Sequence, residues 1–248
     1  MGKRWFGTRR PAAPAADPKL PAEHPDIVEP GFLAAVELCR PATMTSIERL
    51  YALYNAVRYV TTAVVPGAFV ECGVWKGGSV MMMALALLER GVTDRDIYLF
   101  DTFAGMTPPT DKDVDYRGAR ASALLEREGR ETNTFWAYSP REEVRANLAK
   151  TGYPAERFVF VEGDVLATIP ASAPPHIALL RLDTDWYEST RHEMEHLFPR
   201  LENRGVLIVD DYGYYQGARQ AVDEYLARDP RSYLMNRIDF TGRLIVKC

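Results

Sequence analysis

Residues 68–79 read AFVECGVWKGGS, and this stretch decides the fold of the 248-residue chain. A short apolar run ends near Glu71 and passes through closely spaced glycines into residues 79–90, which have helical length and composition. Glycines at a strand-to-helix turn let a ligand approach the backbone at the helix N-terminus. The spacing matches neither GxGxxG nor the P-loop pattern. The stretch therefore predicts an α/β domain with a ligand at this turn, although a purely structural tight turn would use the same residues.

Apolar runs and amphipathic stretches alternate from here to the C-terminus. Buried strands are predicted at residues 68–74, 97–100, 158–161, 177–182 and 206–209. Helices are predicted at residues 43–63, 79–90, 141–151, 187–201 and 216–228. Buried strands separated by helices form a parallel sheet that is covered on both faces. Two more strand-like runs, 234–240 and 244–246, flank Thr241-Gly242 and predict an antiparallel hairpin with a two-residue turn.

This chain order is that of the class I methyltransferase fold, a doubly wound, mostly parallel sheet closed by an antiparallel C-terminal hairpin. The helix predicted at 43–63 precedes the first strand as an N-terminal helical extension. Residues 1–42 begin with a Pro- and Ala-rich stretch and are predicted to be a tail or arm. Residues 43–248 are predicted to form a single domain. Within it, residues 103–139 are too long for a simple connection and predict a lid or substrate loop.

Composition and charge narrow the class of protein. The net charge is −4, and nothing in the sequence indicates a nucleic-acid groove or an anionic membrane partner. No run of 18 apolar residues is present, so no membrane-spanning helix is expected. Cys39, Cys72 and Cys248 lie far apart and indicate a reducing compartment rather than a disulfide framework. We expect a cytoplasmic protein that acts on a small molecule.

Acidic residues stand at the ends of the first three predicted strands. Glu71 opens the glycine turn, Asp101 ends the second strand, and Asp164 follows the third. Ligands of open α/β sheets bind outside the carboxyl ends of the strands, where a carboxylate can accept hydrogen bonds from ribose hydroxyls. An acidic residue at the turn suits an ammonium and sulfonium ligand better than a pyrophosphate. Although Asp101 alone could be a helix cap, together these residues predict S-adenosylmethionine binding.

Four more aspartates follow the next two strands, Asp183 and Asp185 after the fourth and Asp210 and Asp211 after the fifth. Two like charges about 4 Å apart repel by roughly 4 kcal/mol at an effective dielectric near 20. A hard cation such as Mg²⁺ relieves that repulsion; protonation of one aspartate with helix capping by the others is the alternative. A bound cation lowers the pKa of a hydroxyl. With Asp183, Asp210 and Asp211 on the metal, Asp185 remains as the candidate general base, or as a cap for the following helix.

Residues 192–196 read HEMEH and match the HExxH pattern of zinc proteases. On a helix, the apolar face of this stretch carries Met194 and Leu197, and both histidines lie roughly opposite to it. The sequence offers no suitable third ligand downstream. We therefore expect His192 and His196 to face solvent on a crossover helix.

From about residue 44 to residue 248 the chain resembles the macrocin O-methyltransferase family. The matching stretches are TMTS (43–46), FVECGVWKGG (69–78), FDTFAGM (100–106), LDTDWYEST (182–190) and DDY (210–212). The resemblance implies a Mg²⁺-dependent methyl transfer from S-adenosylmethionine to a deoxysugar hydroxyl of a glycoside, by a homo-oligomer. It also implies Asp183, Asp210 and Asp211 as metal ligands and Asp185 as the base. The cofactor residues expected from it are Met44, Thr45, Glu71, Gly73, Val74, Trp75, Gly78, Ser79, Asp101, Thr102, Phe103, Asp164, Val165 and Asp183.

Two other functions fit the same residues. A catechol-type O-methyltransferase also uses Mg²⁺ and a vicinal diol, but it needs a second base less because a metal-bound phenol is already acidic. A regulatory module that binds S-adenosylmethionine without catalysis would keep the glycine turn and Asp101. The four aspartates at positions 183, 185, 210 and 211 speak against that module.

Overall fold

The computed structural model describes residues 23–126 and 134–248. Its strands form one seven-stranded sheet in the order β3-β2-β1-β4-β5-β7-β6, in which β7 runs antiparallel to both neighbours. Every other neighbouring pair is parallel. The predicted doubly wound sheet with an antiparallel closing hairpin is confirmed. The strands are β1 Ala68–Cys72, β2 Ile97–Asp101, β3 Phe158–Glu162, β4 Ile177–Leu182, β5 Leu201–Val209, β6 Met235–Arg237 and β7 Arg243–Val246.

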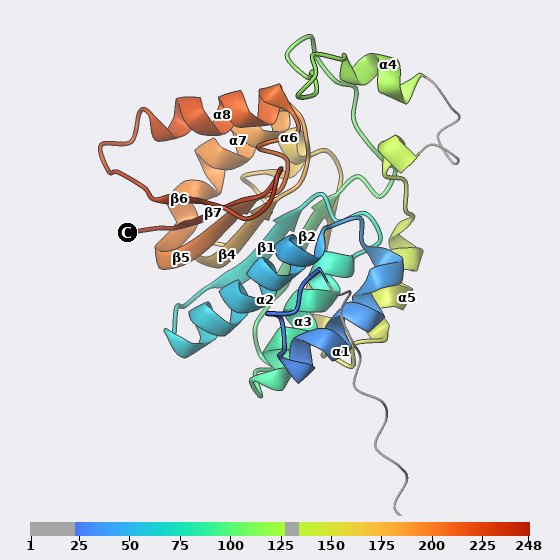
Figure 1. Cartoon of the computed structure of the whole chain (residues 1–248), viewed down its shortest axis with the longest axis vertical. Coiled ribbons are helices and arrows are strands. Elements are labelled where there is room, and N and C mark those ends of the chain that lie inside the picture. Colours follow the sequence, from blue (N-terminus) through green and yellow to red (C-terminus); the bar gives the residue numbers. More distant parts are fainter. Residues whose placement is uncertain (1–22, 127–133) are drawn as a thin grey trace, which may run out of the picture.

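Helices cover the two faces of the sheet in separate layers (Figure 1). One layer packs on Phe69, Leu99 and Leu179 of the central strands, and the other packs on the alternating positions such as Val70 and Leu180. The first layer consists of α1 Pro30–Cys39, α2 Ile47–Thr62, α3 Gly78–Glu89 and α5 Arg141–Ala149. The second consists of α6 Val165–Thr168, α7 Tyr187–His196 and α8 Gln216–Leu226.

The N-terminal part of the described chain is helical and belongs to the core. Residues 30–42, assigned from the sequence to a tail or arm, form α1 and the 3₁₀ turn Arg40–Ala42. Phe32, Val36 and Cys39 are fully buried in the first layer. Proline at the start of α1 suits the first helical turn, where its missing N–H is not needed. The Pro- and Ala-rich residues 1–22 lie outside the described residues.

Two predicted boundaries are corrected by the structure. The turn between β6 and β7 spans residues 238–242 instead of two residues, because Arg237 already pairs with Arg243. The Asp239 carboxylate organises this turn by accepting hydrogen bonds from the backbone N–H groups of Thr241 and Gly242. Helix α7 ends at His196 instead of Leu201, and Pro199 lies in the 3₁₀ turn that follows. Proline cannot continue an α-helix because it has no N–H to donate.

The long insertion after β2 lies over the carboxyl end of the sheet and contains the short helix α4 Ala121–Leu125 and the 3₁₀ turn Thr134–Trp136. It is anchored to the second helical layer. Asp115 forms a β-bridge with Tyr215, and the side chains of Ala121 and Leu125 pack with Trp186 in a small apolar cluster. The indole N–H of Trp186 also donates to the carbonyl of Thr107 at 2.9 Å. This anchoring places the insertion beside the site described next.

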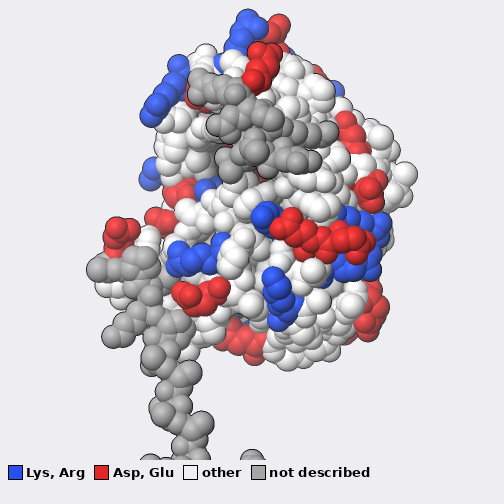
Figure 2. Space-filling model, turned by 90° about the vertical axis from the view of Figure 1, so that its right-hand side faces the viewer, with Lys and Arg blue, Asp and Glu red and all other residues white. Residues whose placement is uncertain are grey.

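The surface carries charges of both signs. Acidic and basic side chains alternate on the face in Figure 2, so the described residues of this face form no continuous basic patch. Nucleic-acid binding uses such a patch. Among the described residues, no helix has both the length and the apolar character needed to cross a bilayer.

Candidate active site

A cavity of about 320 Å³ opens at the carboxyl ends of the parallel strands. Its walls come from the segment before α2, the glycine turn, the end of β2, the insertion, the loops after β3, β4 and β5, and the β6–β7 turn. Open α/β sheets bind their ligands at this edge. The predicted residues that line the cavity are Met44, Thr45, Glu71, Gly73, Val74, Trp75, Gly78, Ser79, Asp101, Thr102, Asp164, Val165, Asp183, Asp185, Asp210 and Asp211.

The glycine turn is closely packed on its neighbours. A Cβ at Gly73 would lie 2.0 Å from the carbonyl oxygen of Asp183, and the φ of Gly73 is +78°. A Cβ at Gly78 would lie 2.5 Å from the carbonyl oxygen of Ala42. Only glycine allows the backbones to approach this closely. The first close contact joins the turn to the loop after β4, and the second joins the start of α3 to the N-terminal segment.

Asp101 holds the glycine turn in shape. Its Oδ2 accepts hydrogen bonds from the backbone N–H groups of Val74 at 2.7 Å and Trp75 at 3.2 Å, and its Oδ1 accepts one from Phe103 at 2.7 Å. Burial raises the pKa of Asp101, while these hydrogen bonds oppose the rise. The Phe103 ring does not line the cavity and packs against Phe160 instead, with ring centroids 5.8 Å apart. The part of Phe103 nearest to the site is therefore its backbone.

A buried arginine that sequence reasoning missed joins the acidic strand ends. Arg181 of β4 is only 2% exposed. Strand register places it beside Glu71 of β1, and its guanidinium contacts the carboxylates of Glu71, Asp183 and Asp210. The distance from Nη1 to Oδ2 of Asp183 is 2.6 Å. A buried charge is tolerated where it is paired and hydrogen-bonded. An arginine within the apolar run 177–182 was the available signal.

Glu71 has one carboxylate oxygen in use and one without a partner. Oε1 accepts a hydrogen bond from Arg181, while Oε2 is buried and accepts none from the residues that the structure describes. Burial raises the pKa of Glu71 to about 8, although Arg181 favours the charged form. Buried polar atoms without partners are rare in folded proteins and call for an explanation. An ammonium group of a ligand would supply the missing donor.

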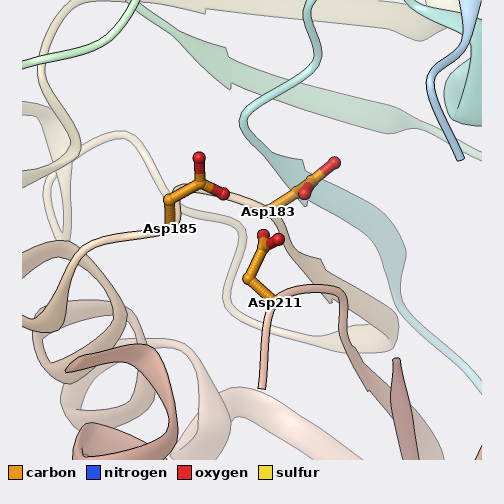
Figure 3. A group of neighbouring side chains, drawn as sticks. All are labelled: Asp183, Asp185 and Asp211. Carbon is orange, nitrogen blue, oxygen red and sulfur yellow. The ribbon is translucent and has the colours of Figure 1, made fainter. Parts of the chain in front are cut away.

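Three aspartates converge between the ends of β4 and β5 (Figure 3). One carboxylate oxygen each from Asp183, Asp185 and Asp211 lies within 4.8 Å of the other two. Oδ2 of Asp211 is buried and accepts no hydrogen bond from the described part of the chain. Burial and the neighbouring acids raise the pKa of Asp183 and of Asp211 well above the ordinary range, and burial raises that of Asp185 to about 7. The group has the composition of a site for a hard cation.

Asp185 adopts an unusual backbone conformation. Its φ is +66°, so the chain leaves the extended conformation here, and the side chain converges with Asp183 through a left-handed turn. The α7 N-terminus, which Asp185 could have capped, is served by the insertion instead. The Tyr187 N–H donates to Oδ1 of Asp113 at 2.7 Å. Asp113 is fully buried and its Oδ2 accepts from the backbone N–H of Thr110. The structure thus gives Asp185 no capping hydrogen bond.

Asp210, the other predicted metal ligand, lies between two arginines. Its Oδ1 contacts Arg181 and its Oδ2 contacts Arg49 of α2. The Nε of Arg49 also lies 3.0 Å from Oδ2 of Asp239 in the β6–β7 turn. The converging group therefore shares Asp183 and Asp211 with the predicted ligand set and has Asp185 in place of Asp210. Arg49, which lines the cavity, is a second charged residue that sequence reasoning missed.

The HEMEH stretch forms no metal site. Nε2 of His192 lies 2.9 Å from the carbonyl oxygen of Ile169, and the rings of His192 and His196 contact each other with centroids 4.4 Å apart. Both rings are half-buried instead of facing open solvent. Glu193, between them, turns the other way and is fully buried. The second helical layer holds this helix more closely than its polar composition indicates.

The chain is similar to proteins of one family over most of its length. The profile of the macrocin-O-methyltransferase family (TylF) matches residues 39–247. An 8-demethyl-8-(2,3-dimethoxy-alpha-L-rhamnosyl)-tetracenomycin-C 4'-O-methyltransferase from Streptomyces olivaceus is 38% identical over 202 residues, 81% of this chain and 73% of that protein. A demethyldecarbamoylnovobiocin O-methyltransferase from Streptomyces niveus is 37% identical over 186 residues, 75% of this chain and 68% of that protein.

A solved structure is also similar to this chain. The structure of the O-methyltransferase NovP superimposes with a TM-score of 0.71 at 33% sequence identity, covering 83% of this chain and 82% of that chain. The expected class I methyltransferase fold is confirmed by this likeness and by the strand order.

Proposed function

The chain belongs to the macrocin-O-methyltransferase family, and from that premise we propose that it methylates a sugar hydroxyl of a glycosylated small molecule in a reaction that depends on S-adenosylmethionine and Mg²⁺. The observation that carries the proposal is the convergence of three aspartates in the cavity that the glycine turn also lines. One cavity can therefore hold a methyl donor and a cation side by side.

The methyl donor would be held by the glycine turn and the first strand ends. Oε2 of Glu71, which has no partner among the described residues, fits the amino-acid ammonium of S-adenosylmethionine. Asp101 shapes the turn and would face the ribose, and the α6 N-terminus at Asp164 lines the cavity nearby. S-adenosylmethionine would supply an electrophilic methyl group at this place. The residues expected to contact it otherwise include Met44, Thr45, Val74, Trp75, Ser79, Thr102 and Val165.

The charge balance of the rim fits a divalent cation. Two guanidinium groups, from Arg49 and Arg181, contact an acidic group that contains Glu71 and the aspartates at 183, 185, 210 and 211. The acids outnumber the arginines, and Oδ2 of Asp211 still has no partner among the described residues. Asp183, Asp210 and Asp211 would hold the cation. Asp210 stays in this set because each carboxylate oxygen has two lone pairs, so contact with an arginine leaves room for a ligand bond.

Asp185 would take the proton from the acceptor hydroxyl. An alcohol is a poor nucleophile toward a methyl sulfonium until its proton is removed. The Mg²⁺ ion, when bound, lowers the pKa of a hydroxyl beside it. A carboxylate with a pKa near 7 can accept that proton at neutral pH, and Asp185 lies next to the presumed ligands without a capping role. Asp185 would hold the proton while the acceptor oxygen takes the methyl group.

A sugar acceptor is supported by the names of the relatives, and the cavity has room for an acceptor beside aromatic side chains. The Streptomyces olivaceus and Streptomyces niveus proteins bear names that describe methylation of a rhamnosyl-tetracenomycin and of a novobiocin precursor. In this chain, Tyr214 and Tyr215 line the cavity together with Met106 and Phe135 of the insertion. We propose that residues 103–139 form the substrate loop and that the enzyme is a homo-oligomer, as the resemblance implies.

The test is turnover with methyl-labelled S-adenosylmethionine and two acceptor panels, rhamnosyl glycosides and catechols, each with Mg²⁺ and with excess EDTA. We expect label in the glycosides with Mg²⁺ and none with EDTA. Label only in catechols would replace the sugar acceptor by the catechol-type reaction. Undiminished turnover in EDTA would reject the metal mechanism. Tight S-adenosylhomocysteine binding without turnover of either panel would support the regulatory module.

A further inference from the structure

A buried carboxyl group on α7 lies directly behind the acidic rim and has no part in the chemistry proposed above. Glu193 is the glutamate of the HEMEH stretch, and its side chain is fully buried on the sheet side of the helix. Both of its carboxyl oxygens lie within hydrogen-bond distance of the Thr184 hydroxyl, at 3.0 and 3.1 Å. The side chain that HExxH would use as a base therefore points at the loop after β4.

Thr184 is the residue between Asp183 and Asp185. Its side chain packs between Glu193 and the glycine turn, since a Cβ at Gly73 would lie 3.4 Å from its Cγ2. Its carbonyl accepts a hydrogen bond from the Trp186 N–H at 2.7 Å. Thr184 is thus held both at its side chain and at its carbonyl, in the middle of the segment that carries the two aspartates.

Packing alone does not require a carboxyl group at position 193. No arginine, lysine or histidine of the described chain forms an ion pair with Glu193; its contacts are the hydroxyl of Thr184 and the thiol of Cys72. Burial raises the pKa of Glu193 to about 8. A buried polar group costs free energy that an apolar side chain of the same size would not. The contacts with the Thr184 hydroxyl and the Cys72 thiol are what the carboxyl group adds, and the first of them reaches the loop of the aspartates.

We propose that Glu193 is a positioning residue that holds Thr184 and so keeps Asp183 and Asp185 turned toward the same space. The Asp183 N–H donates to the carbonyl of Cys72 at 2.9 Å, so the Glu193 contact and this backbone bond fix the loop from two sides. Without the first, Asp185 would lose the support for its left-handed backbone conformation. The role of Asp183 in metal binding, on which one measurement depends, rests on the proposed function.

The experiment compares four single variants and one double variant with the wild-type full-length protein. Glu193→Ala removes the carboxyl group, Glu193→Gln keeps an acceptor of the same shape, and Thr184→Val removes the hydroxyl and keeps the branched shape. Glu195→Gln is the matched control, because Glu195 lies on the same helix and pairs with Arg191 at the surface. For each we would measure the melting temperature, S-adenosylhomocysteine and Mg²⁺ affinities by calorimetry, and hydrogen exchange of the peptide at residues 182–187.

We expect Glu193→Ala and Thr184→Val to weaken Mg²⁺ binding by about tenfold, as loss of an outer-shell partner does. S-adenosylhomocysteine affinity should stay near the wild-type value, and Glu193→Gln should restore Mg²⁺ binding. The double variant Glu193→Ala with Thr184→Val should bind Mg²⁺ as tightly as the single variant with the lower Mg²⁺ affinity, because the two residues act through one contact. Faster exchange of peptide 182–187 should accompany the loss in both single variants and be absent from Glu195→Gln.

Wild-type Mg²⁺ affinity in Glu193→Ala and Thr184→Val with unchanged exchange of the peptide would overturn the inference, whatever the melting temperatures. Additive losses in the double variant would also count against a shared contact. If the wild-type protein itself binds no Mg²⁺, the metal part of the proposed function fails separately. The exchange rates then decide alone: faster exchange in both variants supports the positioning role, and unchanged exchange rejects it.

Discussion

At the scale of single residues, the site is a balance between carboxylates and two arginines. Arg181 lies at the centre of this balance, because its guanidinium contacts carboxylates from three neighbouring strand ends. Its buried charge is paired with these carboxylates and favours their charged forms, although burial raises the pKa of Glu71 and of Asp183. Burial also raises the pKa of Asp185 to about 7 and that of Asp211 well above its ordinary range, and these two aspartates are proposed as the general base and as a metal ligand.

Asp101 gives the first prediction at this scale. Asp101→Ala removes the acceptor for three backbone N–H groups that shape the glycine turn. We expect S-adenosylhomocysteine binding to weaken by about 1–3 kcal/mol, the range for groups left unpaired. Isothermal calorimetry measures this. Asp96→Ala is the control, because Asp96 lies at the other end of the strand and its side chain pairs with Arg157 at the surface. Equal affinities in wild type and Asp101→Ala would remove Asp101 from the cofactor site.

Asp185 gives the second prediction at the scale of single residues. A positioned base contributes about 10²–10⁴-fold, so Asp185→Asn should lower kcat by that factor while Mg²⁺ and S-adenosylhomocysteine still bind. A cap would behave differently, because Asn caps a helix nearly as well as Asp. In the structure the backbone N–H of Tyr187 donates to Asp113 and not to Asp185, so we expect the loss of kcat and not the behaviour of a cap. Steady-state rates with saturating Mg²⁺ and a glycoside found in the acceptor screen decide it; a kcat close to wild type would leave Asp185 without a catalytic role.

At the scale of elements, the sequence predicted the strands well and the polar interior poorly. Unbroken apolar runs between helical stretches mark a buried parallel sheet, and acidic residues at their ends mark its binding edge. The contacts of Arg181 depend on strand register, which joins residues far apart in the chain and has no local signal. Helix α1 was missed because it follows a Pro- and Ala-rich stretch and its apolar residues do not form one clear stripe.

Helix α1 gives a stability prediction. Phe32 is fully buried against Tyr51 and Tyr54 of α2, with ring centroids 5.0 and 5.4 Å away. Phe32→Ala should lower the free energy of unfolding by about 3–5 kcal/mol, the usual cost of such a cavity. Chemical denaturation measures it. Val28→Ala serves as control, because Val28 is 68% exposed just before the helix. A loss no larger than that of the control would mean that residues 30–42 are an arm outside the folded core.

Glu193 on α7 gives a pH prediction. Its pKa rises from 4.5 to about 8 on folding, through burial and the acids Asp183 and Asp164. The folded state therefore binds this proton more tightly than the unfolded state, and the contribution to stability falls as pH rises from about 5 to about 8. Its size is on the order of a few kcal/mol. The free energy of unfolding, measured by chemical denaturation at several pH values, should lack this fall in Glu193→Gln and keep it in Glu195→Gln. The same dependence on pH in both variants and in the wild-type protein would contradict the raised pKa.

At the scale of the whole molecule, one edge of the sheet gathers parts that lie far apart in the sequence. The segment before α2, the insertion and the β6–β7 turn meet around the strand ends, and Arg49 ties α2 both to Asp210 of the rim and to Asp239 of the turn. The chain belongs to the macrocin-O-methyltransferase family, and this edge is where we propose that methyl transfer takes place. Light scattering would test the proposed homo-oligomer.

The most direct test of the central claim is a calorimetric titration of Mg²⁺ into the protein saturated with S-adenosylhomocysteine. The wild-type protein should bind Mg²⁺ saturably. Asp211→Asn should lose that binding while its affinity for S-adenosylhomocysteine persists, because Oδ2 of Asp211 is a buried oxygen of the three-aspartate group without a partner among the described residues. Asp185→Asn should bind Mg²⁺ like the wild type. No Mg²⁺ binding by the wild-type protein, or equal binding by Asp211→Asn, would contradict the cation site on which the account depends.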